Sequence, residues 1–460
     1  MAITAGGSLV LTNAAPVKQT LATNYIDFTA AGTAGWAQQY LPDLYEAEVE
    51  RYGDRTLAGF LQATGSEMPM SSDQIIWTEQ GRLHLSYTTG DVQAADAGNN
   101  NTQDIQGLTG HAIRKGQTVV IKENGGAIKK AYVTNADPNN NGNEIEVKGY
   151  AGAIATGAAT LFVYGSEFAK GDSGMSGAVT PKHTSLTNKP IILKDKYEIS
   201  GSDASQIGWV EVTGESGQTG YLWYIKAEGD TRSRFEDYME MALVEGETAG
   251  NSDLTEVEGT EGLFAAITSR GHVTNEVTGA GASADLASFD EILKKLDKQG
   301  SIEENMLFLN RDVSLAIDDM LAAQNSYGTD GTSYGVFNNS SDMALNLGFS
   351  GFRRGSYDFY KTDWKYLNDA STRGLVGGVR GVLVPAGTST VYDQIIGKNL
   401  KRPFLHVRYR ASEADDRRMK SWVTGSVGGA ATSDLDAMEV HYLTERCLVV
   451  QGANNFMIFK

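Results

Sequence analysis

The chain has 460 residues, 41% of them apolar, which is enough for two or three domains around a sizeable core. Its formal net charge of −18 argues against sequence-wide attraction to nucleic acid and against adsorption to an anionic membrane surface. The single cysteine, Cys447, excludes an intramolecular disulfide and a thiolate zinc site, and its apolar neighbours predict a buried, inert thiol. We find neither a signal peptide nor an apolar stretch long enough to span a bilayer, so we expect a cytoplasmic origin.

The N-terminal region begins with an extended segment. Residues 1–35 are rich in Ala, Thr and Gly, which is typical of an arm. Apolar residues then recur at roughly helical spacing over 44–57 and predict a short amphipathic helix. Alternating apolar residues over 75–87 predict strands on either side of a turn at 80–81.

A group of short strand signals follows a polar segment. Residues 88–106 are polar and predict a loop. Four β-type runs come next, separated by Gly-rich turns, at 118–121, 131–134, 145–147 and 159–168. Short strands at this spacing predict a small barrel or sandwich, which we place at about 108–166 as an insertion in a larger domain.

Helices and strands alternate in the second half of the chain. A strand signal over 191–205 precedes a long charged helix, expected over 220–246. The helix over 285–300 has an apolar stripe of Phe289, Ile292, Leu293 and Leu296.

A buried strand at 305–310 follows, and then a helix over 311–325 with Asn310 as its N-cap. Val313, Ile317, Met320 and Leu321 should face inward on this helix. Strand signals continue to the end of the chain. The order predicts an α+β protein that contains an α/β layer.

The long helix contains the most heavily charged stretch of the chain. Carboxylates and guanidinium groups interleave there, at Glu228, Asp230, Arg232, Arg234 and Glu236. Paired carboxylates are the raw material of acid–base catalysis, but they need a cleft and separated environments. Interleaved charges on one helix face are more typical of a solvated face or of an interface between subunits.

The strongest metal signal is the stretch 137–144. Asp137, Asn139 and Asn141 match the opening half of a calcium-binding EF-hand loop. The closing glutamate of such a loop is replaced by Lys148, and the flanking segments are strand signals. An Asn-Gly pair between strands also forms a hairpin turn by itself. The turn is our main prediction, and weak calcium binding by these side chains stays as the alternative.

Two short motifs carry no functional prediction. Residues 171–174 spell the Gly-Asp-Ser-Gly string of chymotrypsin-like proteases, without a convincing His and Asp context for a triad. A polar Gly/Ser loop explains that string. The Gly-rich run 374–381 lacks the Lys-Ser/Thr pair that a phosphate-binding P-loop requires.

Two stretches resemble segments of the major capsid proteins of tailed bacteriophages, which have the Hong Kong 97-type fold. The stretch "TSLTNKPIILKDKYEISGSDAS", 184–205, is similar to the returning strand of that family's E-loop. The stretch "GYLWYIKAEGDTRSRFEDYMEMALVEGE", 220–247, is similar to the long spine helix of its peripheral (P) domain. The resemblance is one of pattern and order, and it spans most of the chain.

The resemblance implies a division of the chain into five parts. They are an N-terminal arm with a short helix (1–70), an E-loop region with the inserted β-rich module (71–200), a P domain with the spine helix (201–284), an axial (A) domain (285–410), and C-terminal strands that return to the P domain (411–460).

The same resemblance implies a structural protein that is not an enzyme and needs no cofactor. Copies of the chain would form hexamers and pentamers of an icosahedral head, assembled in the host bacterial cytoplasm. The head would enclose double-stranded phage DNA without sequence-specific binding. Implied partners are portal and scaffolding proteins and capsid decoration proteins. A separate scaffolding protein is expected because the sequence has no long acidic, helical N-terminal segment of the kind that some members cleave off.

Candidate interface residues follow from the same reasoning. The arm residues Tyr25, Phe28 and Trp36 are apolar groups that an extended segment buries poorly, so neighbouring copies should cover them. Arg232 and Arg234 are candidates to pair with acidic groups of adjacent subunits. The remaining candidates are Arg82, Glu228, Asp230 and Glu236.

Two other functions stay open. A β-rich virion or surface adhesin would not need the helix–strand–helix unit at 289–321. A cytosolic hydrolase would use the carboxylates of 228–240.

Overall fold

The computed structural model describes most of the chain beyond residue 66. The described residues are 67–80, 84–96, 101–138, 142–177, 183–202, 211–213, 219–250, 257–275, 277, 282–299, 302–324, 351–393, 398–427 and 431–460. The chain divides into two compact units. One is Ile76–Leu186, and the other combines Met1–Ile75 with Thr187–Lys460.

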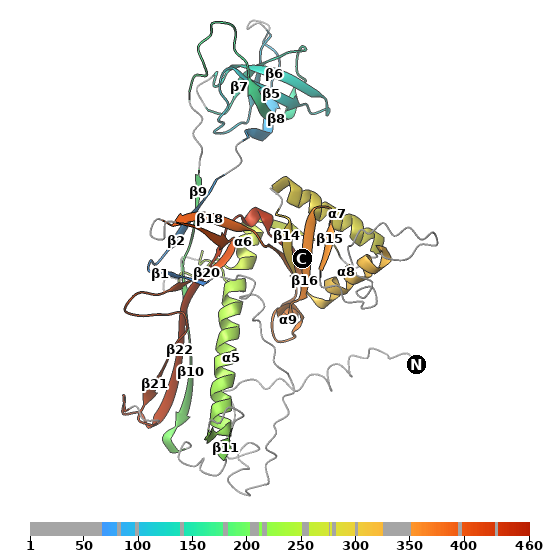
Figure 1. The fold of residues 1–460 in the computed structure, drawn as a ribbon. Coiled ribbons are helices and arrows are strands. Elements are labelled where there is room, and N and C mark those ends of the chain that lie inside the picture. The colour runs from blue at the N-terminus through green and yellow to red at the C-terminus, as the bar shows by residue number, and fades with distance from the viewer. Residues whose placement is uncertain are drawn as a thin grey trace. The chain divides into compact units, whose positions relative to one another are not determined.

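The unit Ile76–Leu186 contains a closed barrel of antiparallel strands in the order β3-β4-β7-β6-β5-β8 (Figure 1). Its strands are β3 (Ser86–Val92), β4 (Gln103–Gln106), β5 (Gln117–Lys122), β6 (Ile128–Asn135), β7 (Ile145–Gly149) and β8 (Gly157–Ser166). Alternate side chains point inward and fill the barrel. Those that are almost completely buried include Ile105, Val119, Ile121, Val133, Val147 and Leu161. The predicted barrel-like module is confirmed.

The barrel begins earlier than the sequence predicted. The segment 88–106, expected as a loop, contributes strands β3 and β4. The reason is that β3 carries little apolar alternation, since Gly90 takes one of its inward positions. A Cβ at Gly90 would lie 3.1 Å from the carbonyl oxygen of Ala159, so the close approach of β8 favours glycine there.

A two-stranded ribbon accompanies the barrel. It pairs β2 (Ile75–Gln80) with β9 (His183–Asn188), strands that are more than one hundred residues apart in sequence. The strands predicted on either side of 80–81 both form, but with different partners. β2 pairs with β9, whereas β3 pairs with β4 and β8.

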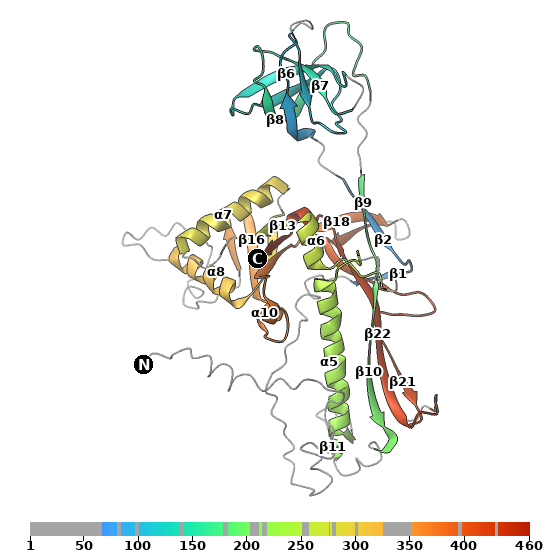
Figure 2. The same ribbon diagram turned by 180° about the vertical axis from the view of Figure 1, so that it is seen from behind.

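The larger unit contains a five-stranded sheet that packs on the long helix α5 (Leu222–Glu245) (Figures 1 and 2). Its strands are β1 (Glu67–Met70), β20 (Leu405–Arg410), β22 (Ala437–Val450), β10 (Ile191–Ser200) and β21 (Lys420–Gly425), the last paired with β22. The 24 residues of α5 match the predicted helix. Phe235 of α5 is buried and stacks on Tyr442 of β22, with ring centroids 5.8 Å apart.

One strand of this sheet lies in a segment that was predicted to have a different structure. Residues 67–70 belong to the segment expected as arm and short helix, but they form β1, which pairs in parallel with β20. A strand of four residues is too short to show a clear alternation in the sequence. Its partner lies more than three hundred residues away, so only the tertiary structure selects it.

The second sheet of this unit has six strands and helices on both faces. Its order is β13-β23-β17-β14-β16-β15. The strands are β13 (His272–Thr274), β23 (Met457–Phe459), β17 (Gly381–Pro385), β14 (Glu304–Leu309), β16 (Tyr357–Asp363) and β15 (Gly351–Arg354). Helices α7 (Ala282–Gln299) and α8 (Arg311–Gln324) bury their apolar stripes against one face. The other face packs on α6 (Leu263–Arg270) and the C-terminal end of α5.

The predicted helix–strand–helix unit is confirmed in detail. Phe289 and Ile292 of α7 are fully buried. The predicted inward residues of α8 are each at most 2% exposed. The side chain of Asn310 accepts a hydrogen bond from the backbone N–H of Val313 at 2.9 Å, so Asn310 is the N-cap of α8.

The C-terminal strands belong to two different sheets. β21 and β22 lie in the sheet that packs on α5, but β23 pairs with β17 and β13 in the six-stranded sheet. The return of 411–460 to the P domain stays a prediction, and the strands of this segment belong to two different sheets. Met457, Ile458 and Phe459 are all buried, as expected of a strand covered on both faces.

Several short elements complete the described structure. They are the strand pairs β11 (Glu211–Thr213) with β12 (Thr219–Tyr221) and β18 (Thr388–Asp393) with β19 (Lys398–Pro403), the helices α9 (Lys365–Asn368) and α10 (Arg373–Val376), and the 3-10 helix η3 (Ala453–Asn455). Within the described residues, no helix combines the length and the hydropathy that a bilayer-spanning segment needs.

Candidate functional site

The predicted charged stretch lies along α5. Arg232 pairs with Glu236 one turn further on, with 3.1 Å between Nε and Oε1, and both side chains are largely exposed. Glu228 and Asp230 are half-buried on the N-terminal half of the helix. An exposed i,i+4 ion pair adds little to stability, because water solvates both groups well. Arg232 and Glu236 are thus accessible to another molecule.

Arg234 has a different environment from Arg232. Its Nη2 lies 2.8 Å from Oδ2 of Asp195 on β10, and both side chains are mostly buried. This ion pair links α5 to the edge strand of the five-stranded sheet within one chain. Arg234 was predicted as a subunit-contact residue, and here it is engaged by its own chain.

Glu240 is the one carboxylate of the charged helix that is buried among apolar groups. It is 5% exposed, and its Oε2 has no hydrogen-bond partner among the described residues. Met241, Val244, Trp364 and Tyr366 surround it. Burial raises the pKa of Glu240 to about 8, with smaller contributions from Asp237 and Glu236, and Arg446 opposes the shift. Glu240 is therefore largely protonated at neutral pH.

The environment of Glu240 could have been found in the sequence. Residues 236, 240 and 244 follow one another at i,i+4 spacing, and Val244 is buried beside Glu240. The sequence analysis grouped Glu240 with the other carboxylates of 228–240 and did not single it out. The signal that was missed is a carboxylate with the apolar residues Met241 and Val244 beside it on the helix.

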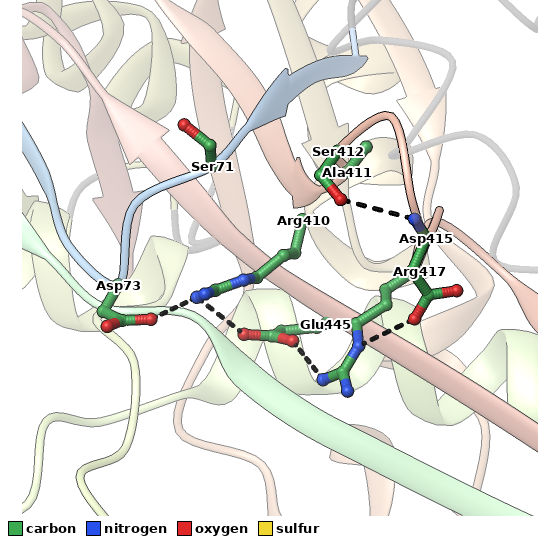
Figure 3. A pocket seen from close by; sticks show the side chains of 8 residues that line it. All are labelled: Ser71, Asp73, Arg410, Ala411, Ser412, Asp415, Arg417 and Glu445. Atoms are coloured by element: carbon green, nitrogen blue, oxygen red, sulfur yellow. Dashed lines mark hydrogen bonds and ion pairs between the residues drawn. The ribbon is translucent and has the colours of Figure 1, made fainter.

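A second polar site lies beside the five-stranded sheet, where a cavity of about 440 Å³ opens between β1, β20 and β22 (Figure 3). Glu445 of β22 is at its centre and is 5% exposed. Its two oxygens lie 3.5 Å from Nη1 of Arg410 and 2.6 Å from Nη1 of Arg417. Arg410 also pairs with Asp73, and Arg417 with Asp415. The complete lining is Ser71, Asp73, Arg410, Ala411, Ser412, Asp415, Arg417 and Glu445.

The charges of this cavity suit a structural role and not proton transfer. The hydrogen bond from Arg410 lowers the pKa of Asp73, and the hydrogen bond from Lys420 lowers the pKa of Asp415. Both carboxyl groups are therefore ionised at neutral pH, and guanidinium groups do not release their protons. Such a cluster lacks a general acid or base. Its ion pairs connect the segment after β1 with β20, with β22 and with the loop that follows β20.

A second group of charged side chains holds β1 against the sheet. Glu67 accepts hydrogen bonds from Arg446 of β22, at 3.2 Å, and from Arg418. The guanidinium of Arg446 is almost fully buried and also donates to the backbone oxygen of Arg418 at 2.5 Å. These residues were not singled out from the sequence, because the partners are far apart along the chain and share no motif.

The predicted calcium residues lie only partly in the described region. Oδ1 of Asp137 accepts a hydrogen bond from the backbone N–H of Gly142 at 3.1 Å, in the segment between β6 and β7. Asn139 and Asn141 lie outside the described residues. In the parts that are described, no three His, Cys, Asp or Glu side chains gather in a way that could hold a metal ion.

Four of the predicted interface residues cannot be placed. Tyr25, Phe28, Trp36 and Arg82 lie outside the described residues. Their role as contacts between copies stays a prediction.

One family model is similar to part of the chain. Residues 175–341 match the family model described as SU10 major capsid protein. The matched residues include both stretches that resemble capsid segments, and so contain β10 and α5. No curated protein matches the sequence significantly.

Solved structures of phage proteins are also similar to this chain. The structure named for Microbacterium phage Oxtober96 is 8% identical and has a TM-score of 0.38, with 91% of this chain and 95% of that chain covered. The one named for Mycobacterium phage Adephagia is 10% identical at a TM-score of 0.37, with 94% and 98% covered. The asymmetric unit of the bacteriophage PhiM1 mature capsid is 10% identical at a TM-score of 0.34, with 64% and 77% covered.

All three TM-scores are low, and the similarity to a capsid protein family comes from the sequence of residues 175–341. Over those residues the chain is similar to the SU10 major capsid protein family, which supports its identification as a major capsid protein of a tailed bacteriophage.

Proposed function

We propose that this chain is the shell subunit of a Hong Kong 97-type capsid and that its copies form the hexamers and pentamers of an icosahedral head around packaged phage DNA. The observation that carries the proposal is the match of residues 175–341 to a major capsid protein family. That match falls on the strand–helix order that the sequence alone connected with capsid proteins.

The proposal gives each part of the fold a role. Residues 71–200 are the E-loop region, with the β2–β9 ribbon and the barrel as its insertion. Residues 201–284 form the P domain, in which α5 is the spine helix on the five-stranded sheet. Residues 285–410 form the A domain, built mainly on the six-stranded sheet. Residues 411–460 return to the P domain, and the segment before β1 is the N-terminal arm with its short helix.

The architecture of the P domain supports a role as a strut. α5 is long and is fixed to its sheet by the Phe235–Tyr442 stack and the Arg234–Asp195 ion pair. Its Arg232 and Glu236 are exposed along the same helix. We therefore retain Glu228, Asp230, Arg232 and Glu236 as contacts to adjacent subunits, together with the arm residues. Arg234 has its stronger role inside the subunit.

The remaining assignments follow from the shell role. The chain is assembled in the bacterial cytoplasm and resides in the virion. Portal and scaffolding proteins are its assembly partners, and decoration proteins are further partners on the finished shell. A net charge of −18 suits a container of DNA, because a strongly acidic wall does not adsorb the packaged phosphates.

Electron microscopy of the purified chain, together with its mass in solution, tests this function. We expect closed shells or rings of five or six subunits. Arg232→Glu should reduce assembly and leave the subunit folded, because Arg232 is 62% exposed. Arg353→Glu is the matched control, since Arg353 is 59% exposed and also ion-paired. A chain that remains monomeric when concentrated and co-expressed with its virion partners would contradict the proposal.

A further inference from the structure

The sequence contains two Asn–Gly pairs, Asn124–Gly125 and Asn141–Gly142. The first lies in sequence between β5 and β6 of the barrel, and the second between β6 and β7. An asparagine that precedes glycine is prone to react with the next backbone nitrogen, because glycine has no Cβ to hinder the approach. By sequence the two pairs are alike, but the hydrogen bonds of their glycine N–H groups differ.

The reaction requires a glycine nitrogen that is available to attack. After it loses its proton, this nitrogen bonds to Cγ of the preceding asparagine, and the bond from Cγ to Nδ2 breaks with loss of ammonia. The product is a five-membered succinimide ring. Water then opens the ring at either carbonyl group, which gives aspartate or isoaspartate. A hydrogen bond from the glycine N–H opposes the first step, because it holds the proton and fixes the direction of the nitrogen.

Asn124 and Gly125 lie in the exposed turn that joins β5 to β6 (Figure 1). Two backbone hydrogen bonds hold this turn. The N–H of Gly126 donates to the carbonyl oxygen of Glu123 at 2.8 Å, and the N–H of Glu123 donates to that of Ala127 at 2.9 Å. Within the described part of the chain, neither the N–H of Gly125 nor the side-chain amide of Asn124 has a hydrogen-bond partner. Both reacting groups are therefore available.

The N–H of Gly142 has the opposite environment. It donates to Oδ1 of Asp137 at 3.1 Å, and the carbonyl oxygen of Gly142 accepts from the N–H of Gly110 at 3.0 Å. A carboxylate acceptor holds the proton of this N–H, and its negative charge opposes the formation of an anionic nitrogen beside it. The nitrogen that would attack the side chain of Asn141 is therefore engaged and electrostatically disfavoured.

We propose that Asn124 is a site of spontaneous deamidation in the folded chain, whereas the fold protects Asn141. The modification places a carboxylate beside Glu123 on an exposed turn, so each modified chain gains one negative charge. Isoaspartate also adds one methylene group to the main chain, close to the point where Lys122 of β5 is opposite Ile128 of β6. The site belongs to the barrel and does not depend on whether the chain forms a shell.

Peptide mapping by mass spectrometry tests the proposal on the full chain, incubated at neutral and at mildly alkaline pH. A sample taken at time zero corrects for deamidation during digestion. Asn124 should react at least about tenfold faster than Asn141, the factor that corresponds to a hydrogen bond to a charged acceptor. The rate at Asn124 should rise about tenfold per pH unit, because the fraction of deprotonated nitrogen does so. In the urea-denatured chain the two asparagines should react at similar rates.

Two variants are matched to the two sites. Gly125→Ala should slow the reaction at Asn124 several-fold, because a methyl group hinders the attacking nitrogen. The substitution should preserve the fold, since φ at Gly125 is not positive and a Cβ there would have no atom within 4 Å. Asp137→Ala should accelerate the reaction at Asn141, because it releases the N–H of Gly142, and should leave Asn124 unchanged. Circular dichroism and thermal melting establish that each variant folds.

The proposal is overturned by equal rates at Asn124 and Asn141 in the folded chain, or by a faster reaction at Asn141. It is also overturned if the denatured chain shows the same difference, which would assign it to the flanking sequence. An unchanged rate at Asn124 in Gly125→Ala would exclude attack by that nitrogen. A folded Asp137→Ala variant in which Asn141 stays unreactive would refute the protection by the Gly142 hydrogen bond.

Discussion

Arg234 on α5 donates hydrogen bonds from Nε and Nη2 to the same oxygen of Asp195 on β10, at 3.2 and 2.8 Å. The two residues are 39 positions apart and join the spine helix to the edge of its sheet. Two positions earlier on the helix, Arg232 forms an exposed ion pair. The helix thus contains one arginine that is fixed to its own sheet and another, two residues earlier on a different side, that is accessible.

The first prediction separates these two arginines. Arg234→Ala should lower the free energy of unfolding by about 1–2 kcal/mol, because it removes charge-assisted hydrogen bonds from a mostly buried pair. Arg232→Ala should change it by less than about 0.5 kcal/mol, since exposed pairs contribute little. Urea denaturation followed by circular dichroism measures both. Equal effects of the two substitutions would show that the Arg234–Asp195 pair stabilises the fold no more than the exposed Arg232–Glu236 pair does.

The second prediction concerns Asn188, which is 4% exposed at the end of β9. Its amide group donates to the carbonyl oxygens of Leu448 at 2.7 Å and Glu261 at 3.0 Å. Its Oδ1 accepts from the N–H groups of Lys189 and Glu261, both at 2.8 Å. Asn188→Ala should cost about 2–4 kcal/mol of unfolding free energy, because it leaves buried backbone groups unpaired.

Asn188→Asp should also destabilise the chain, since a carboxylate cannot donate to the two carbonyl groups. Lys189→Ala is the neighbouring control and should cost less than about 0.5 kcal/mol, because its side chain forms an exposed ion pair with Glu258. Thermal melting of the three variants orders these effects. An Asp variant as stable as the parent would refute the donor role of Asn188.

The third prediction is a pH dependence that arises from Glu240. Its folded-state pKa is about 8 against an ordinary 4.5. Between these values the folded chain holds a proton that the unfolded chain has released, so the contribution of Glu240 to stability falls as pH rises through this window. Glu240→Gln removes the titration. The stability of the Gln variant relative to the parent should therefore increase by on the order of 3 kcal/mol from pH 4.5 to pH 8.

Denaturation curves of both proteins at several pH values give this difference directly, and titrations of other groups cancel in it. The groups that act on Glu240 from its surroundings are Asp237 and Glu236 on α5 and Arg446 on β22. Arg446 opposes the shift and so limits the upper end of the window, whereas the unfolded carboxyl sets its lower end near pH 4.5. Parallel stability curves for the two proteins would mean that Glu240 is ionised in the folded chain.

The fourth prediction concerns the thiol of Cys447, which is fully buried in β22. Burial raises its pKa to about 12, so almost no thiolate exists at neutral pH. Maleimide should not label the native chain at pH 7 within hours and should label the denatured chain at one thiol per chain. Mass spectrometry counts the adducts. Rapid labelling of the native chain would contradict the burial of β22.

The fifth prediction compares two glycines with positive φ. Gly425 has φ +122°, and a Cβ there would lie 1.9 Å from the carbonyl oxygen of Ala437. Gly110 has φ +66° with no atom within 4 Å of such a Cβ. Gly425→Ala should cost about 3 kcal/mol or more in unfolding free energy, and Gly110→Ala about 1 kcal/mol, because only the first adds a collision to the backbone strain. Similar melting temperatures for the two variants would disprove the close approach of β21 and β22.

The sequence by itself determined the elements whose signals are local. The stripe of α7, the cap and stripe of α8, the buried β14 and the long α5 all formed where they were predicted. Periodicity of 3.6 residues and a capping side chain act within a few residues, so they can be read without knowledge of the rest of the fold. The same applies to the inward residues of β5 to β8, which are strongly apolar.

Only the tertiary structure decided how distant segments pair. β1 pairs with β20, and β23 joins the six-stranded sheet. β3 and β4 complete a barrel whose first strand was predicted only after residue 108. The cluster of Asp73, Arg410 and Glu445 joins groups up to 372 positions apart, and the burial of Glu240 depends on Trp364 and Tyr366. Such contacts form because whole faces of sheets and helices must exclude water together, and that requirement acts through space and not along the chain.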